Sequence, residues 1–184
     1  MRTEVLNATE EVLGDISRDA VQTEALNATG VYTAECYDSE GNLKWSDTVE
    51  NLVVTVGKND LLDKYFQASA YTPTWYMGLV SGATTPTYAA TDTLATHAGW
   101  TELAAGTAYT GNRITVGWSA ASAGSKTSTT TAFPIIATNT VAGCLMTNVN
   151  TGTSGILYSA GSFTGGNKSV SSGDTLNVTY TASV

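Results

Sequence analysis

Few residues in this chain have the chemistry of a catalytic group, and they are widely spaced. The single histidine, His97, would need a serine in a Gly-x-Ser-x-Gly turn to build a Ser–His–Asp triad, and that motif does not occur. Paired carboxylates for glycoside hydrolysis could form only if Asp92 or Glu102 met an acidic residue of the first predicted hairpin. We therefore predict that His97 has a structural role and that the chain is not an enzyme.

The two cysteines, Cys36 and Cys144, offer little for metal or redox chemistry. They lie far apart, and their spacing matches neither a metal-binding nor a redox motif. The N-terminus has no apolar stretch of the kind that forms a secretory signal, so we expect both thiols to stay reduced at strand positions. The sequence predicts no metal and no cofactor.

The net charge lies entirely in the first third of the chain. Residues 1–64 contain thirteen of the sixteen acidic residues and five of the eight basic residues, which gives −8, and the rest of the chain sums to zero. No basic cluster is present to bind nucleic-acid phosphates. No apolar run approaches the roughly 18 residues that a membrane helix needs. We expect neither nucleic acid nor a membrane as a partner.

The side-chain pattern becomes typical of strands at Gly30. β-Branched and aromatic residues flank a turn at 39–42, where Gly41 can adopt a positive φ, so residues 31–56 predict a β-hairpin. Residues 57–67 predict a helix with Asn59 as its N-cap. The apolar residues of this helix share one side, which we expect to pack on the sheet. They are Leu61, Leu62, Tyr65 and Phe66.

Short strands separated by Gly, Asn and Ser turns make up the rest of the body. The predicted strands cover residues 75–80, 113–119, 127–137, 141–147, 155–159 and 175–182. This succession favours an antiparallel β-sandwich or a jelly-roll-like fold over a parallel α/β sheet. The chain is thus predicted to be mainly β, with one short helix packed on a body of residues 30–184. Residues 1–29 are predicted to form an acidic arm that is extended and partly helical.

Two groups of residues are candidates for contacts with a partner. Aromatic residues in predicted loops are one group, because Tyr and Trp bury a large area at modest entropic cost. Apolar residues of the arm are the other, since their burial would supply affinity while the acidic charges guide the encounter. Core packing of the aromatic residues, sugar stacking by them, and a solvated arm are the alternatives. The candidates are Leu6, Val12, Leu13, Ile16, Tyr71, Tyr88, Trp100 and Tyr109.

Several short motifs match those of a known protein family in sequence and in spacing, over about 150 residues from the hairpin to the end of the chain. They are Tyr37–Trp45, Glu50–Val53, Gly57–Asp63, Trp75–Leu79, His97–Glu102, Gly155–Gly161 and Ser172–Val178. In these motifs the chain resembles a family of structural virion proteins of tailed bacteriophages, described as capsid decoration or cement proteins and sometimes as tail-fibre proteins. Residues 1–29 fall outside the resemblance.

The resemblance implies a protein that is made in the cytoplasm of the bacterial host and binds the outer surface of the assembled capsid. Its partners would be the major capsid protein and copies of itself, with a trimer favoured. It would stabilise the head by bridging neighbouring capsid subunits. The main alternative is a tail-fibre or head-fibre module that binds a glycan or receptor on the host surface, and a polysaccharide depolymerase is a third.

Overall fold

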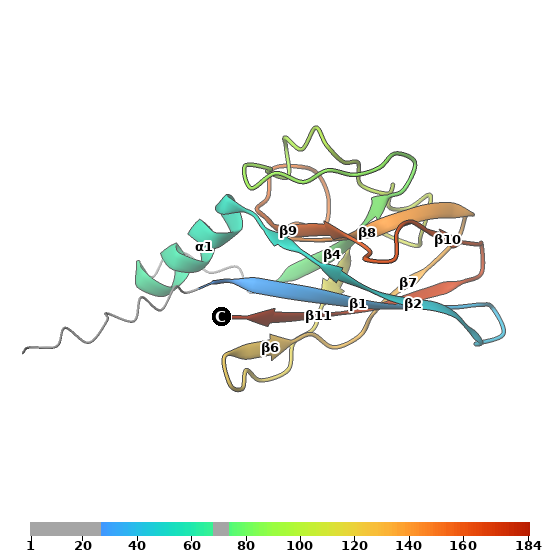
Figure 1. The fold of residues 1–184 in the computed structure, drawn as a ribbon, viewed down its shortest axis with the longest axis horizontal. Coiled ribbons are helices and arrows are strands. Elements are labelled where there is room, and N and C mark those ends of the chain that lie inside the picture. Colours follow the sequence, from blue (N-terminus) through green and yellow to red (C-terminus); the bar gives the residue numbers. More distant parts are fainter. Residues whose placement is uncertain (1–26, 68–73) are drawn as a thin grey trace, which may run out of the picture.

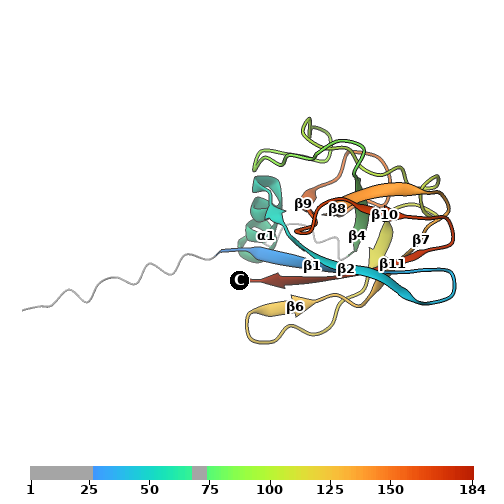
Figure 2. The ribbon, with the colours of Figure 1, turned by 45° about the vertical axis from the view of Figure 1, so that its right-hand side comes forward.

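The computed structural model describes residues 27–67 and 74–184. These residues form two antiparallel β-sheets packed face to face, with a helix at one end of the sandwich (Figures 1 and 2). The mainly-β antiparallel sandwich with one short helix that the sequence predicts is confirmed for these residues. The first strand begins at Thr29, one residue before the predicted start of the body. Most of the predicted arm, residues 1–26, lies outside the described residues.

Sheet A alternates regularly between buried and exposed side chains. In its strand β1, Tyr32, Ala34 and Cys36 are buried in the core, while Thr33 and Glu35 are exposed on the outer face. This period of two is the pattern of a sheet with one dry and one solvated face. The strands, in spatial order, are β2 (Leu43–Glu50), β1 (Thr29–Tyr37), β11 (Thr175–Ser183) and β6 (Ser125–Thr127), and β7 (Thr131–Pro134) also pairs with β11.

Sheet B is buried on both faces, which its nearly continuous apolar sequence explains. In its central strand β8, Cys144 and Met146 join the core shared with sheet A, while Leu145 joins a second core on the other face. The strands, in spatial order, are β3 (Leu52–Val53), β9 (Leu157–Ser162), β8 (Asn139–Thr147), β4 (Trp75–Ser81) and β5 (Ile114–Val116), and β10 (Lys168–Val170) also pairs with β8.

The long connection between β4 and β5, residues 82–113, forms a third layer over sheet B. We call this segment the loop layer. Leu94 and Trp100 from the loop layer pack on Val80, Leu145 and Leu157 of the sheet. Figure 1 shows the same segment, in green, lying across the top of β9, β8 and β4. Burial of these side chains holds a segment that has little regular secondary structure of its own.

The helix α1 (Thr55–Phe66) corrects two predictions. Its N-cap is Val54, not Asn59, and no side chain caps it. The predicted packing side is also wrong, because Gly57 is the buried residue of α1, while Leu62, Tyr65 and Phe66 are exposed. A Cβ atom at Gly57 would lie 2.6 Å from the carbonyl oxygen of Tyr158, so the missing side chain lets α1 approach β9 closely.

Some strand boundaries also differ from prediction. The hairpin ends at Glu50 rather than at residue 56, because the chain crosses to sheet B at Asn51, whose N–H donates to the carbonyl of Gly30 at 3.2 Å. The predicted strand 127–137 is interrupted and forms β6 and β7, and β5 is shorter than predicted. β10 was not predicted. The strands β4, β8, β9 and β11 lie close to where the sequence places them.

Candidate interaction surface

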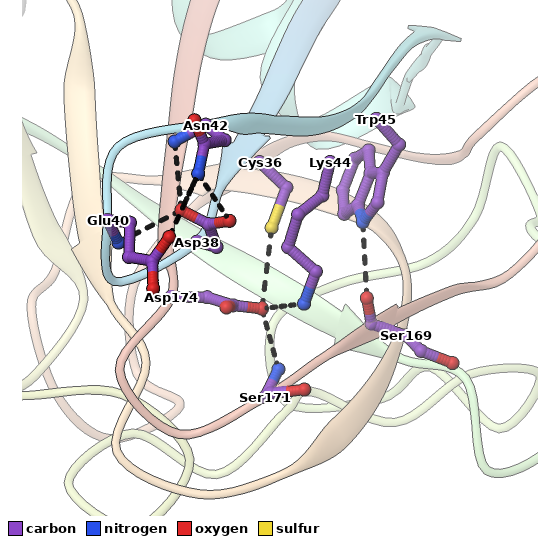
Figure 3. A network of polar contacts seen from close by, with 9 residues as sticks. All are labelled: Cys36, Asp38, Glu40, Asn42, Lys44, Trp45, Ser169, Ser171 and Asp174. Atoms are coloured by element: carbon purple, nitrogen blue, oxygen red, sulfur yellow. Dashed lines mark hydrogen bonds and ion pairs between the residues drawn. The ribbon is translucent and has the colours of Figure 1, made fainter.

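A cluster of polar contacts surrounds the carboxylate of Asp174, in the turn before β11 (Figure 3). Its Oδ2 accepts hydrogen bonds from Lys44 Nζ at 2.6 Å and from the Ser171 N–H at 2.7 Å, and the Cys36 thiol donates to it at 3.7 Å. Burial would raise the pKa of Asp174, but the donors, led by Lys44, lower it below the usual value. Asp174 therefore joins the β1–β2 hairpin to the turn between β10 and β11 and serves a structural purpose.

The two thiols are poor nucleophiles in this environment. Burial, and then the nearby charge of Asp174, raise the pKa of Cys36 to about 11. Burial also raises the pKa of Cys144 well above its usual value. Both are free and lie in strands, as predicted. Because the thiolate is the reactive form, neither cysteine is set up for attack on a substrate or for metal binding at neutral pH.

The hairpin turn beside this cluster is held by Asp38 (Figure 3). Its Oδ1 accepts from the backbone N–H groups of Glu40 at 2.9 Å and Asn42 at 2.8 Å. Hydrogen bonds from Asn42 are the main reason that the pKa of Asp38 is lowered. Nearby, the Trp45 indole N–H donates to the Ser169 carbonyl at 3.1 Å. These contacts fix the turn and the edge of sheet A.

Asp47 connects the edge of sheet A to the loop between β9 and β10. Lys168 Nζ lies 2.7 Å from its Oδ2, the Thr164 hydroxyl donates to its Oδ1 at 2.7 Å, and the Gly165 N–H donates to its Oδ2 at 3.0 Å. The side chain of Asp47 is buried, so this ion pair contributes to holding the two sheets together.

Arg113 and Glu102 fix the end of the loop layer. Both oxygens of Glu102 accept from the guanidinium, from Nε at 2.8 Å and from Nη2 at 2.6 Å. Arg113 Nη1 donates to the carbonyls of Val149 at 3.1 Å and Gly152 at 3.0 Å. This bidentate geometry engages both carboxylate oxygens of Glu102 in a structural contact.

The remaining candidate catalytic residues also serve structure. The His97 ring stacks on Trp100 with centroids 3.8 Å apart, and its Nδ1 lies 3.0 Å from the Trp100 carbonyl oxygen. Asp92 accepts from the Trp100 indole N–H at 3.0 Å and from the Ala89 N–H at 3.1 Å. Among the residues that the structure describes, no group of three His, Cys, Asp or Glu side chains could hold a metal.

The predicted contact surface of loop aromatics is not present in the form we expected. Trp100 is 4% exposed and Tyr109 is 0% exposed, so both are core residues that hold the loop layer on sheet B and on Phe133. Tyr88 is half-buried, and its hydroxyl lies 2.9 Å from that of Ser162. The other predicted contact residues lie outside the described residues; they are Leu6, Val12, Leu13, Ile16 and Tyr71.

Two shallow hollows flank the segment 102–104 of the loop layer. Their volumes are about 240 Å³ and about 440 Å³. Both are lined by aliphatic, amide and hydroxyl side chains and by Glu102, Arg113 lines only the smaller one, and neither contains an aromatic ring. A sugar would therefore find no stacking surface in either hollow. With Trp100 and Tyr109 buried, the glycan-binding alternative loses two of the four loop aromatics that favoured it.

The two most exposed large apolar side chains of the described residues, Tyr65 and Phe66, lie together on α1 beside the exposed Leu62. Leu62, Tyr65 and Phe66 are 41%, 81% and 73% exposed, and we call them the α1 patch. Their spacing of i, i+3 and i+4 puts them on one side of the helix. The rings of Tyr65 and Phe66 contact edge to face with centroids 5.0 Å apart. The sequence indicated this apolar side correctly, but it did not reveal that Gly57 turns the opposite side toward the sheet.

The comparisons with known proteins give no further indication of function. No protein-family model matches the sequence, and no curated protein matches it. None of the helices in residues 27–67 and 74–184 is long and apolar enough to span a bilayer.

Proposed function

We propose that the chain is a structural component of a tailed-phage virion that binds the outer surface of the assembled capsid. In this proposal the protein contacts the major capsid protein, bridges neighbouring subunits and acts together with further copies of itself, with a trimer favoured. The resemblance of the sequence motifs motivates the proposal. The observation that carries it is the α1 patch. Two aromatic rings with such a large exposed fraction on a mostly polar body are typical of a protein contact.

The chemistry of the body supports binding rather than turnover. The carboxylates of Asp47, Glu102 and Asp174 are paired with Lys168, Arg113 and Lys44 in contacts that connect strands and loops. A body cross-linked by such contacts suits a repeated contact on a lattice. A ligand that binds only the assembled shell stabilises it by RT ln(1 + [L]/Kd) at each site, and the effect is multiplied over many copies.

The test uses particles that lack this protein, to which purified variants are added back before heating. We expect the unmodified chain to restore heat resistance and Tyr65→Ser/Phe66→Ser to fail, while that variant keeps its free energy of unfolding within about 0.5 kcal/mol because the side chains are exposed. Leu43→Ser is the matched control, since Leu43 is 55% exposed but lies on β2.

Two results would count against the proposal. Particles without the protein could be as stable as complete ones, which would remove the stabilising role. The double variant could also restore stability as well as the unmodified chain, which would remove the α1 patch from the contact. Imaging that places the protein on the tail alone would favour the fibre alternative.

A further inference from the structure

Cys36 and Lys44 meet at one oxygen atom of Asp174 (Figure 3). The sulfur of Cys36 lies 3.7 Å from Oδ2, and the amine nitrogen of Lys44 lies 2.6 Å from the same atom. These two distances add up to 6.3 Å, which is therefore the largest separation that the sulfur and the nitrogen can have. A thiol and an amine on paired strands are thus close neighbours.

A β-bulge in the β1–β2 pair explains this meeting. The register shifts after Cys36, which pairs with Trp45, so that Lys44 has no partner position on β1. In a regular strand Lys44 and Trp45 would point to opposite faces, whereas a bulge re-aims a side chain. Trp45 packs against the core, and Lys44 reaches the carboxylate that accepts the hydrogen bond of the inward-facing Cys36.

A thiol beside an amine has a specific chemistry when an oxidant is present. A peroxide converts a thiolate to a sulfenic acid. Sulfenic acids condense with a neighbouring nitrogen to give a sulfenamide, in which sulfur and nitrogen share a single bond. The side chain of Lys44 is 30% exposed on a flexible four-carbon stem, so its nitrogen can move the few ångströms that remain.

We propose that Cys36 and Lys44 form a modification site, at which hydrogen peroxide joins the two strands through a sulfenamide bond. In the first step the thiol RSH and H2O2 give RSOH and water, so that the sulfur loses two electrons to the peroxide. In the second step the neutral amine R′NH2 attacks the sulfur of RSOH and gives RS–NHR′ and water, after the ammonium proton has passed to solvent. One thiol, one amine and one peroxide thus give one sulfenamide and two waters.

The link should form slowly at neutral pH. Burial, and then the charge of Asp174, raise the pKa of Cys36 to about 11, while Lys44 acts in the opposite direction and Asp38 adds a small rise. The hydrogen bond to Asp174 raises the pKa of Lys44. Both reactive forms are therefore scarce at neutral pH and more abundant in mildly alkaline solution.

The setting in which the link forms rests on the proposed function, whereas the chemistry does not. In a reducing cytoplasm the thiol stays free, as the sequence predicts. A virion leaves that cytoplasm when the host lyses, and the link then accumulates on exposure to peroxide. A measurement on the purified chain therefore tests the link separately from the particle experiment.

The test treats the purified full-length chain for several hours with excess hydrogen peroxide in mildly alkaline buffer without reductant. The chain is then unfolded, its remaining thiols are alkylated, and it is digested with trypsin. Trypsin cleaves after a free lysine but not after one bonded to sulfur. The link therefore gives a single peptide of residues 19–58 that has lost two hydrogens, in place of separate peptides 19–44 and 45–58.

Two controls isolate the role of the amine. Lys44→Arg keeps a positive charge beside Asp174, but a guanidinium stays protonated and does not condense with a sulfenic acid. Cys144 controls for burial within the same chain, because it is a free, buried thiol in β8 whose pKa is raised by burial alone.

We expect the linked peptide to exceed Cys36 sulfinic acid at least about tenfold, because the neighbouring amine traps the sulfenic acid before a second peroxide reacts. Dithiothreitol should restore cleavage after Lys44, and Lys44→Arg should give the sulfinic and sulfonic acids of Cys36 in place of the link. Sulfinic acid at Cys36 in both chains, without the link, would overturn the proposal. A Cys36 thiol that stays free throughout the treatment would also overturn it. Neither result would bear on the capsid contact of the α1 patch.

Discussion

At the scale of single residues, the acid response of the fold depends on carboxylates such as Asp47. Burial would raise the pKa of Asp47, but hydrogen bonds from Lys168 and Thr164 lower it from 3.8 to about 2. A group with a depressed folded-state pKa stabilises the fold above its unfolded pKa, and this contribution is lost as the pH falls through the folded value. The stabilising contribution of Asp47 is therefore lost between about pH 4 and pH 2.

The variant Asp47→Asn tests this window. We expect it to lower the free energy of unfolding at pH 7 by about 1 kcal/mol, since it breaks the ion pair with Lys168, whose side chain is partly exposed. Between pH 4 and pH 2 its stability should fall less steeply than that of the unmodified chain. Urea unfolding at constant ionic strength measures both effects, with Glu50→Gln on the same strand as control. Parallel curves for Asp47→Asn and the unmodified chain would refute the assignment.

At the scale of elements, the contact between α1 and β9 sets the position of the helix. Glycine in a helix is normally less stable than alanine by about 1 kcal/mol. At Gly57 the sign should reverse, because the new Cβ would meet the Tyr158 carbonyl oxygen at 2.6 Å and its Cα at 2.9 Å. Both are backbone atoms and cannot move aside as a flexible side chain would. We predict that Gly57→Ala destabilises the fold by about 1 to 3 kcal/mol.

Chemical denaturation measures that change. Asn59→Ala is the matched control, because Asn59 lies on the exposed side of the same helix. This substitution should leave the stability of the fold unchanged or raise it slightly, because alanine has the better helix propensity. If Gly57→Ala also stabilised the fold, the close approach of α1 to β9 would be wrong.

The elements also show which features a single sequence can predict. The alternation of β1 and the turn at Asp38 are local patterns, so the strand and its turn were predicted well. The burial of Trp100 and Tyr109 depends on the loop layer folding back over sheet B and beside Phe133, which are distant in sequence. The crossing at Asn51 is likewise set by pairing with β9, far along the chain. Neither leaves a signal in the neighbouring residues.

At the scale of the whole molecule, charge and apolar surface should act on different steps of binding. Residues 27–64 hold seven acidic and three basic residues, for a net −4, while the described residues after them sum to zero. Long-range attraction between the acidic first third of the chain and a partner raises association rates and is screened by salt, because the Debye length falls from about 30 Å at 0.01 M to about 10 Å at 0.1 M ionic strength. Short-range apolar contacts set mainly the dissociation rate.

If the proposed capsid contact is correct, the rate of association with purified particles should fall at least about threefold from 0.01 M to 0.1 M salt, with little change in dissociation. Phe66→Ser should leave the association rate nearly unchanged and raise the dissociation rate at least about tenfold, since it removes a largely exposed ring from the contact. Biolayer interferometry with immobilised particles separates the two rates. An association rate independent of salt would mean that the acidic first third of the chain does not face the capsid. A dissociation rate unaffected by Phe66→Ser would place the contact elsewhere on the body.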